Sequence, residues 1–145
     1  MNKNNGFTLI EILVVATIIV LLTATAAVTY STLLKQSRDA KRKTDLEQVR
    51  AALEMYRSNN DEYISTSRNY NCANAAFNYL TTPTKYIESM PTDPKSDSNY
   101  YYRCNVSGDD YTIGAYLETV STPGTCGNCF GTTPCTYCVG PYGEK

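Results

Sequence analysis

Two groups of residues in this chain of 145 have types and spacings that could do chemistry: one carboxylate in an apolar run, and six cysteines. Glu11 is the single charge between Phe7 and Val28. A carboxylate inside an apolar helix of membrane length costs about 2.5–3.5 kcal/mol on insertion scales. A cation beside such a carboxylate makes its burial tolerable, so we expect Glu11 to form an ion pair with another group.

The apolar run around Glu11 is long enough to cross a membrane. As a helix, residues 7–28 rise about 33 Å, which spans the hydrocarbon core of a bilayer. Three interpretations are open: a plain membrane anchor, a secretory signal peptide cleaved in the small-x-small sequence after Ala26, or a segment in which Glu11 has a function. Glu11 argues against the first two interpretations, because both require an uncharged segment.

The residues at the start of this run resemble the N-terminus of a type IV prepilin. They are the polar leader Met1–Gly6, the Gly6–Phe7 junction, and a glutamate at the fifth position of the chain that begins at Phe7. The resemblance implies that a dedicated peptidase cleaves after Gly6 and that Phe7 becomes the N-methylated first residue. It also implies that Glu11 neutralises the Phe7 amine of a neighbouring subunit when subunits leave the membrane for a filament.

The resemblance covers residues 6–63 closely and the rest of the chain loosely. The sequence Pro91-Thr92-Asp93-Pro94, followed by tyrosines, is similar to an element of the major pseudopilins of type II secretion. Many family members also carry a glycine and a proline within the apolar helix, where this chain has Val20 and Val28. We therefore predict a more continuous helix in a filament, loosened only slightly by the hydroxyls of Thr17, Thr23 and Thr25.

The cysteines predict disulfides formed in an oxidising compartment. They are Cys72, Cys104, Cys126, Cys129, Cys135 and Cys138, the last four as two CxxC units. Zinc binding is an alternative, but the five residues between the units are fewer than a zinc ribbon uses. Thioredoxin-like redox chemistry is another alternative, but it needs a CxxC at a helix N-terminus, and glycine, proline and threonine surround these units. We predict that Cys72 pairs with Cys104 and that the four tail cysteines pair among themselves.

A long helix is expected to carry the Glu11 segment. Residues 29–59 contain no proline or glycine, and strong helix formers dominate residues 35–56. The polar residues 58–61 then end the helix. A stripe at helical spacing predicts the face that packs on the globular part: Leu46, Val49, Leu53 and Tyr56.

Two alternating segments, residues 100–106 and 111–117, predict an antiparallel hairpin with one buried face. The expected fold class is α+β: a long N-terminal α-helix, half of it apolar and projecting, packed on a small antiparallel β-sheet, with a disulfide-rich C-terminal loop. The expected divisions are a cleaved leader at residues 1–6, an apolar half-helix at residues 7–28 and an amphipathic half-helix at residues 29–60. A globular head follows at residues 61–145, and its cysteine-rich tail occupies residues 121–145.

The charged residues after the apolar run allow opposing interpretations. The net charge of −1 does not favour nucleic acid. The cluster from Arg38 to Lys43 mixes acids and bases, and Asp39 and Lys43 have the spacing of an i,i+4 pair, so we expect a solvated or inter-subunit face rather than a DNA or lipid patch. Together with Lys35, this cluster outweighs Lys3 of the leader. The positive-inside rule therefore places the C-terminal side in the cytoplasm, whereas the motif and the cysteines place it outside.

Two further patterns carry weaker signals. Asp93, Asp97, Asp109 and Asp110 could offer oxygens to calcium, but calcium-loop spacing is absent, so we expect solvated turn acids. The sequence Asn105-Val106-Ser107 matches a glycosylation acceptor, yet it falls in a predicted strand. The chain has no histidine and no evident nucleophile–base arrangement, so neither an enzyme nor a metal or cofactor is expected.

The predicted function is that of a structural subunit, the major or major-like pilin of a type IV pilus, assembled as a helical homopolymer after cleavage between Gly6 and Phe7. Its expected partners are further copies of the chain, the inner membrane before assembly, the prepilin peptidase and the pilus assembly machinery. Nucleic acid stays open as a partner that no pattern favours. The expected location is a cell-surface pilus with a membrane-anchored precursor pool. The alternatives are a pseudopilin of a type II secretion or DNA-uptake system, and a secreted disulfide-rich binding domain cleaved after Ala26.

Overall fold

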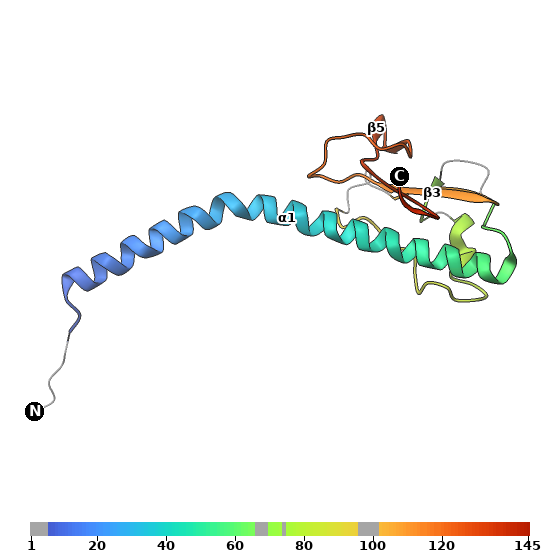
Figure 1. Cartoon of the computed structure of the whole chain (residues 1–145). Helices are drawn as coiled ribbons and strands as arrows, with labels where there is room; N and C mark the ends of the chain where they lie inside the picture. Colours follow the sequence, from blue (N-terminus) through green and yellow to red (C-terminus); the bar gives the residue numbers. More distant parts are fainter. Residues whose placement is uncertain (1–5, 66–69, 74, 96–101) are drawn as a thin grey trace, which may run out of the picture. The chain divides into compact units, whose positions relative to one another are not determined.

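The structure is a computed structural model that describes residues 6–65, 70–73, 75–95 and 102–145 (Figure 1). It divides into two compact units, Met1–Lys35 and Gln36–Lys145, and each is described by itself. One helix, α1 (Leu9–Asn60), contributes residues to both units. Its 52 residues fit the absence of proline and glycine, the two residues that most disfavour a helix interior.

The first turn of α1 is capped by Thr8. The amide and hydroxyl of Thr8 donate hydrogen bonds to Oε2 of Glu11 over 2.8 and 2.7 Å, and the Glu11 amide donates to the Thr8 hydroxyl over 3.4 Å. A threonine at the N-cap with a glutamate three residues later forms a capping box. The helix therefore begins at Leu9, two residues later than a helix that starts at Phe7 would.

The first unit carries an apolar helical segment with no buried residues. Leu9–Ala26 is long and apolar enough to cross a membrane, with a mean hydropathy of 2.5. Threonine hydroxyls in this segment donate to carbonyls of the preceding turn, Thr17 to Val14 over 2.8 Å and Thr23 to Ile19 over 2.9 Å. Hydroxyls that are bonded in this way leave no unsatisfied donor on an apolar surface.

In the second unit, five antiparallel strands form one sheet. Its order is β1 (Tyr70–Asn71), β2 (Arg103–Ser107), β3 (Asp110–Ala115), β6 (Tyr137–Gly140) and β7 (Gly143–Glu144). In the β2–β3 hairpin, Cys104 pairs with Ile113 and Val106 with Tyr111. Gly108 lies in the connecting turn with a φ of +37°, a conformation that glycine adopts without a Cβ penalty.

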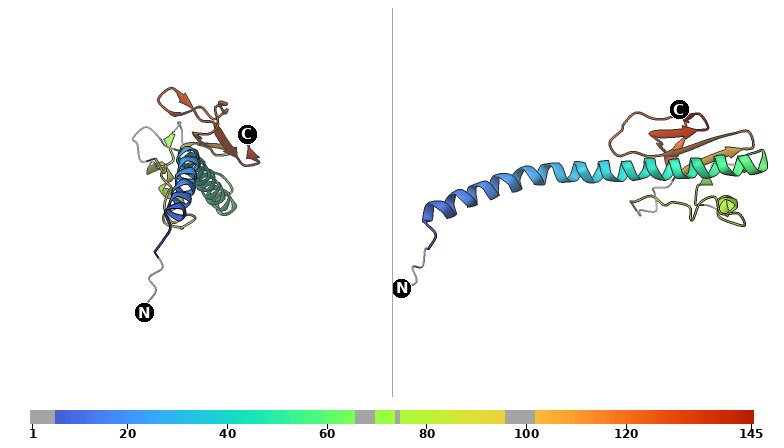
Figure 2. Two further views of the ribbon diagram at one scale, coloured as in Figure 1. Left: turned by 90° about the vertical axis from the view of Figure 1, so that its left-hand side faces the viewer. Right: turned by 60° about the horizontal axis from the view of Figure 1, so that its bottom comes forward.

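The core of the second unit forms on the predicted face of α1. Leu46, Val49 and Leu53 are fully buried, and Tyr56 is partly buried against them. The 3₁₀ helix η1 (Ala75–Leu80) and the sheet lie on different sides of this part of α1 (Figure 2). The described alternate residues of the hairpin are buried as predicted: Tyr102, Cys104, Val106, Tyr111, Ile113, Ala115 and Leu117. Tyr100, predicted to share this face, lies outside the described residues.

The α+β fold class expected from the sequence is confirmed, and the tail has more secondary structure than the sequence predicts. Besides a second small sheet of β4 (Asn128–Phe130) and β5 (Thr133–Pro134), the tail supplies β6 and β7 to the main sheet. Tyr137 and Val139 of β6 join the core. Strand propensity misses these short strands because glycines and prolines interrupt them and their burial depends on tertiary packing.

Candidate functional site

The residues of the predicted N-terminal site lie together at the start of α1. The side chain of Phe7 is 84% exposed, and no atom lies within 4 Å of a Cβ built on Gly6. Glu11 accepts both hydrogen bonds from Thr8 through Oε2. Its other oxygen, Oε1, accepts no hydrogen bond from the described residues.

Thr8 is a residue of this site that the sequence reasoning missed. The signal that could have found it is the Thr-x-x-Glu spacing of a capping box. In this position the Glu11 carboxylate also faces the positive end of the helix dipole, which favours an anion. Glu11 therefore has a local structural role, while its pairing with the Phe7 amine of another copy stays a prediction.

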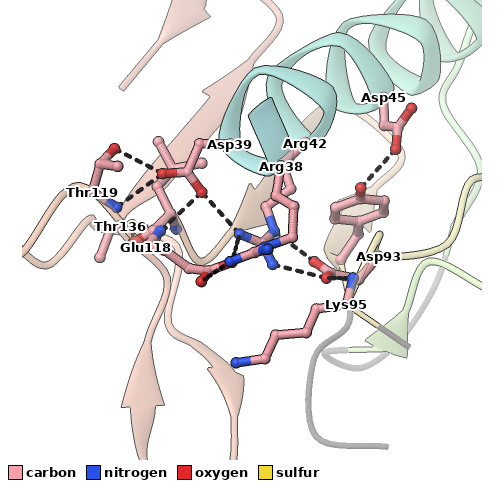
Figure 3. Close-up of polar contacts among 11 residues, drawn as sticks. Arg38, Asp39, Arg42, Asp45, Asp93, Lys95, Glu118, Thr119 and Thr136 are labelled. Atoms are coloured by element: carbon pink, nitrogen blue, oxygen red, sulfur yellow. Dashed lines mark hydrogen bonds and ion pairs between the residues drawn. The ribbon is translucent and has the colours of Figure 1, made fainter. Parts of the chain in front are cut away.

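A second group of polar residues lies inside the second unit, around Arg42 (Figure 3). The Arg42 side chain has no exposed surface and contacts three carboxylates. Its Nε and Nη2 donate to Asp93 over 2.8 and 2.9 Å. Its Nη1 donates to Asp39 over 2.8 Å and to Glu118 over 2.9 Å. Bidentate arginine–carboxylate pairs of this kind are both strong and geometrically specific.

Arg38 and Thr119 complete this group, which we call the charge cluster: Arg38, Asp39, Arg42, Asp93, Glu118 and Thr119. Arg38 donates to both oxygens of Glu118, each over 2.7 Å. Asp39 accepts bonds from the amides of Glu118 and Thr119 and from the Thr119 hydroxyl, over 2.9, 2.8 and 2.7 Å. The charge cluster thereby fastens two remote segments, one at Asp93 and one at residues 118–119, to α1.

The charge cluster corrects several expectations. The sequence predicts a solvated or inter-subunit face for Arg38–Lys43, but Asp39 and Arg42 are buried because helical spacing places them on the core face. Asp39 pairs with Arg42 and not with Lys43, which lies 5.0 Å above the Tyr137 ring. Asp93 is not a solvated turn acid, since its side chain is only 5% exposed.

The other predicted acids do not assemble into a site. Asp109 and Asp110 are exposed, and Asp97 lies outside the described residues. Asp110 pairs with Lys145 over 3.3 Å. Among the described residues, no group of three or more potential ligand side chains is placed to hold a metal ion. Asn105 of the glycosylation pattern is exposed on β2.

The contacts of the charge cluster shift the pKa values of its members. Hydrogen bonds from Arg38 hold the pKa of Glu118 at about 2, although burial acts in the opposite direction. Burial alone raises the pKa of Asp39, but bonds from Glu118 and Thr119 outweigh it and leave that pKa below its usual value. Burial lowers the pKa of Arg42, and its carboxylate partners more than reverse this effect. Asp39 and Glu118 are therefore ionised, and Arg42 protonated, at neutral pH.

Tyrosine hydroxyls satisfy two further carboxylates of α1. Tyr102 donates to Asp45 over 2.7 Å, and Tyr111 donates to Glu54 over 2.7 Å. Tyr63 also donates to Glu54, over 3.1 Å. The rings of these three tyrosines lie in the core, so each combines apolar burial with a polar end that reaches α1.

The structure pairs all six cysteines. The pairs are Cys72–Cys104, Cys126–Cys138 and Cys129–Cys135, with Cα separations of 5.0, 5.7 and 4.9 Å. The first pair joins the segment after α1 to β2, and the other two are nested in the tail. In this oxidised form no thiol is left to bind zinc or to act as a redox nucleophile.

Comparison with known proteins bears on the N-terminal site and on most of the chain. Residues 1–27 match the family model described as the prokaryotic N-terminal methylation motif. The chain is also similar to the type II secretion system core protein G of Pseudomonas aeruginosa, with 29% identity over 120 residues that cover 78% of this chain and 84% of that protein. No solved structure matches the chain.

The N-terminal methylation motif and the similarity to this secretion-system protein show that the chain resembles proteins of the prepilin class. Within that class, the resemblance of this chain to the family of type IV pilins and type II secretion pseudopilins is confirmed. The members of that family are structural subunits. The apolar segment Leu9–Ala26 fits a membrane-anchored precursor of such a subunit.

Proposed function

We propose that this chain is a structural subunit of a helical filament, built from many copies after the leader is removed between Gly6 and Phe7. The observation that carries the proposal is the environment of the Glu11 carboxylate. It is the single charge on the exposed apolar segment, and one of its oxygens has no partner among the described residues. A carboxylate that becomes buried needs a cation beside it, and we propose that this cation comes from another copy of the chain.

Assembly follows from the chemistry of the new N-terminus. Cleavage after Gly6 creates an amine on Phe7, and in the membrane the apolar side chains of residues 7–28 face lipid. In a filament, the helices of other copies cover the same side chains and keep them away from water. The Phe7 amine of one copy then pairs with Glu11 of the next copy, so neither charge is buried alone, and the pair fixes the relative register of the two helices.

We propose the same divisions that the sequence predicts. Residues 1–6 form the leader, residues 7–28 the membrane segment and later filament core, residues 29–60 the amphipathic half of α1, and residues 61–145 the head, with its cysteine-rich tail at 121–145. The partners are further copies, the inner membrane, a prepilin peptidase and an assembly machinery. We propose no enzymatic activity, because the family consists of structural subunits.

We propose a type IV pilus at the cell surface as the filament, with this chain as its major or major-like subunit. The support is the head, in which three disulfides and the buried charge cluster hold remote segments in place. Disulfides form and persist in oxidising compartments such as the cell surface, which fits a domain displayed outside the cell. A pseudopilin is the second candidate, and the similarity to the Pseudomonas aeruginosa protein favours it.

The test uses the full chain produced with its assembly machinery, and filaments are imaged by electron microscopy with an antibody against the head. We expect Glu11→Gln to leave cleavage after Gly6 intact and to reduce filament number at least about tenfold, since the Phe7 amine would be buried without a counter-ion. Thr17→Val is the matched control in the same segment, and it should assemble normally. Wild-type numbers of filaments in the Glu11→Gln strain would refute the assembly role.

The same images separate the two candidates. Long labelled fibres on the cell surface at native expression support the pilus. Fibres that are absent from the surface, with the processed chain present in the inner membrane, support the pseudopilin.

A further inference from the structure

The tail disulfides lie against the strand that leads into the charge cluster. A Cβ built on Gly114 of β3 would collide with Cys126 Sγ and lie 3.2 Å from Cys135 Sγ. Each of these sulfurs belongs to a different disulfide. Gly114 is buried, so both disulfides rest directly on the backbone of β3, three residues before Leu117.

Thr136 connects the disulfides to the residue that precedes the charge cluster. The Leu117 amide donates to Thr136 Oγ1 over 2.7 Å, and the Thr136 amide donates to the Ala115 carbonyl over 3.1 Å. Cys135 and Cys138 stand on either side of Thr136 in the chain, and each is disulfide-bonded. Thr136 is therefore held in place by cross-links on both sides. Figure 3 shows it next to Glu118 and Thr119.

The next two residues carry the contacts to α1. Glu118 and Thr119 donate their amides to Asp39, and Glu118 accepts from Arg38 and Arg42. Asp39 is 4% exposed and Arg42 has no exposed surface. If residues 118–119 moved away, Asp39 would lose three donors and Arg42 one carboxylate, and both would keep a buried charge with fewer partners.

We propose that the tail disulfides and the charge cluster form one redox-controlled latch. Its parts are the disulfides Cys126–Cys138 and Cys129–Cys135, then Thr136, Leu117, Glu118 and Thr119, and finally Asp39 on α1. When both disulfides are formed, the latch holds the segment after β3 on α1. When they are reduced, residues 126–138 lose their covalent cross-links and are held by non-covalent contacts alone, and the contacts of Glu118 and Thr119 with Asp39 open far more often.

The chemistry of the latch is thiol–disulfide exchange. Each bridge forms when a pair of thiols gives two electrons and two protons to an oxidised dithiol partner, which is itself reduced to the dithiol. A chain that has not yet met such an oxidant has an open latch, and export to an oxidising compartment closes it. The latch concerns the head alone, so it holds or fails independently of the proposed filament function.

The test measures hydrogen exchange of the Glu118 and Thr119 amides in the full chain, purified in detergent. In the variant C126S/C129S/C135S/C138S, we expect these two amides to exchange at least about tenfold faster than in the wild type. The matched control is C72S/C104S, which removes the one disulfide outside the latch and should keep the protection. Protection of Glu118 and Thr119 that is unchanged without the tail disulfides would overturn the proposal.

Two further measurements keep the result interpretable. Exchange of the β2 amides reports whether the sheet is still folded in the serine variant. If β2 also loses its protection, the variant Thr136→Val decides between the outcomes. It keeps every disulfide and removes only the hydroxyl that accepts from the Leu117 amide and donates to the Leu117 carbonyl. The latch predicts faster exchange at Glu118 and Thr119 in Thr136→Val with β2 unchanged, and wild-type exchange at these two amides would overturn it.

Discussion

Arg42 of α1 and Asp93 form a two-point ion pair, with Nε 2.8 Å from Oδ2 and Nη2 2.9 Å from Oδ1, across a sequence separation of 51 residues. The pair is shielded from water, since the two side chains are 0% and 5% exposed. Such a pair fixes the Pro91–Pro94 segment against the helix. It also makes the head sensitive to the loss of either partner, because the remaining charge would be buried alone.

Replacing Arg42 by Met should therefore destabilise the head strongly. The variant leaves the carboxylates of Asp39, Asp93 and Glu118 without their shared cation, and we expect a loss of about 3–5 kcal/mol in the free energy of unfolding. Equilibrium denaturation of the full chain in detergent, followed by tyrosine circular dichroism, measures this loss. Lys41→Met, on the exposed side of the same helix, should change stability by less than about 0.5 kcal/mol. Equal stabilities of the two variants would contradict the role of the charge cluster.

The charge cluster also predicts how stability depends on pH. The pKa of Glu118 is about 2 in the folded head, below the usual 4.5 of a glutamate, because Arg38 and Arg42 bind its carboxylate, and the pKa of Asp39 is lowered too. A carboxylate with a lowered folded pKa stabilises the fold above its unfolded pKa, and this contribution is lost as the pH falls toward the folded pKa. Stability should be flat near neutral pH and fall between about pH 5 and pH 2, with Glu118 accounting for up to about 3 kcal/mol.

Glu118→Gln tests this dependence. Denaturation midpoints measured from pH 7 to pH 2 should decline less steeply for this variant than for the wild type. Glu88→Gln removes a carboxylate that is 83% exposed and serves as the control, so its curve should run parallel to that of the wild type. A Glu118→Gln curve as steep as the wild-type curve would show that other groups set the acid dependence.

Gly114→Ala should loosen the tail. Its methyl group would collide with Cys126 Sγ and would lie 3.2 Å from both Cys135 Sγ and the Tyr137 carbonyl oxygen. Overpacking of this kind costs about 1–3 kcal/mol. Thermal unfolding measures the effect, and Asn105→Ala on the exposed face of β2 should be nearly neutral. An Ala variant as stable as the wild type would mean that the disulfides do not rest on β3.

The apolar part of α1 should stay helical in an assembled filament. Val20 and Val28 stand where the resemblance to type IV pilins leads us to expect a glycine and a proline, and the threonine hydroxyls bond within the helix. We expect a filament reconstruction by electron cryomicroscopy to show continuous helical density from Leu9, where the helix begins, to Val28. An unwound stretch of more than a few residues there would contradict this prediction.

Local patterns were enough to predict the helix, its buried stripe and the β2–β3 hairpin. Leu46, Val49 and Leu53 repeat at helical spacing, and Tyr111 and Ile113 alternate, because each element must bury one face. These signals arise within a few residues of one another. The polar residues 58–61 predicted the end of α1 in the same way.

The charge cluster could not be predicted in this way. Nothing near Arg42 in the sequence indicates that Asp93 and Glu118 are its partners, since they come from segments that only the tertiary fold brings together. The helical period of the core face did place Arg42 beside Leu46 and Val49, so its burial could have been inferred. The strands of the tail were hidden for a related reason, because their stability comes from pairing with β3 and from the disulfides.

The most direct test of the account is the intact mass and N-terminal sequence of the mature protein isolated from cells that carry the assembly machinery. We expect a chain that begins at an N-methylated Phe7 and lacks Met1–Gly6. A mature chain that begins at Ala27, or one that retains the leader, would contradict the proposal that this protein is processed as a filament subunit.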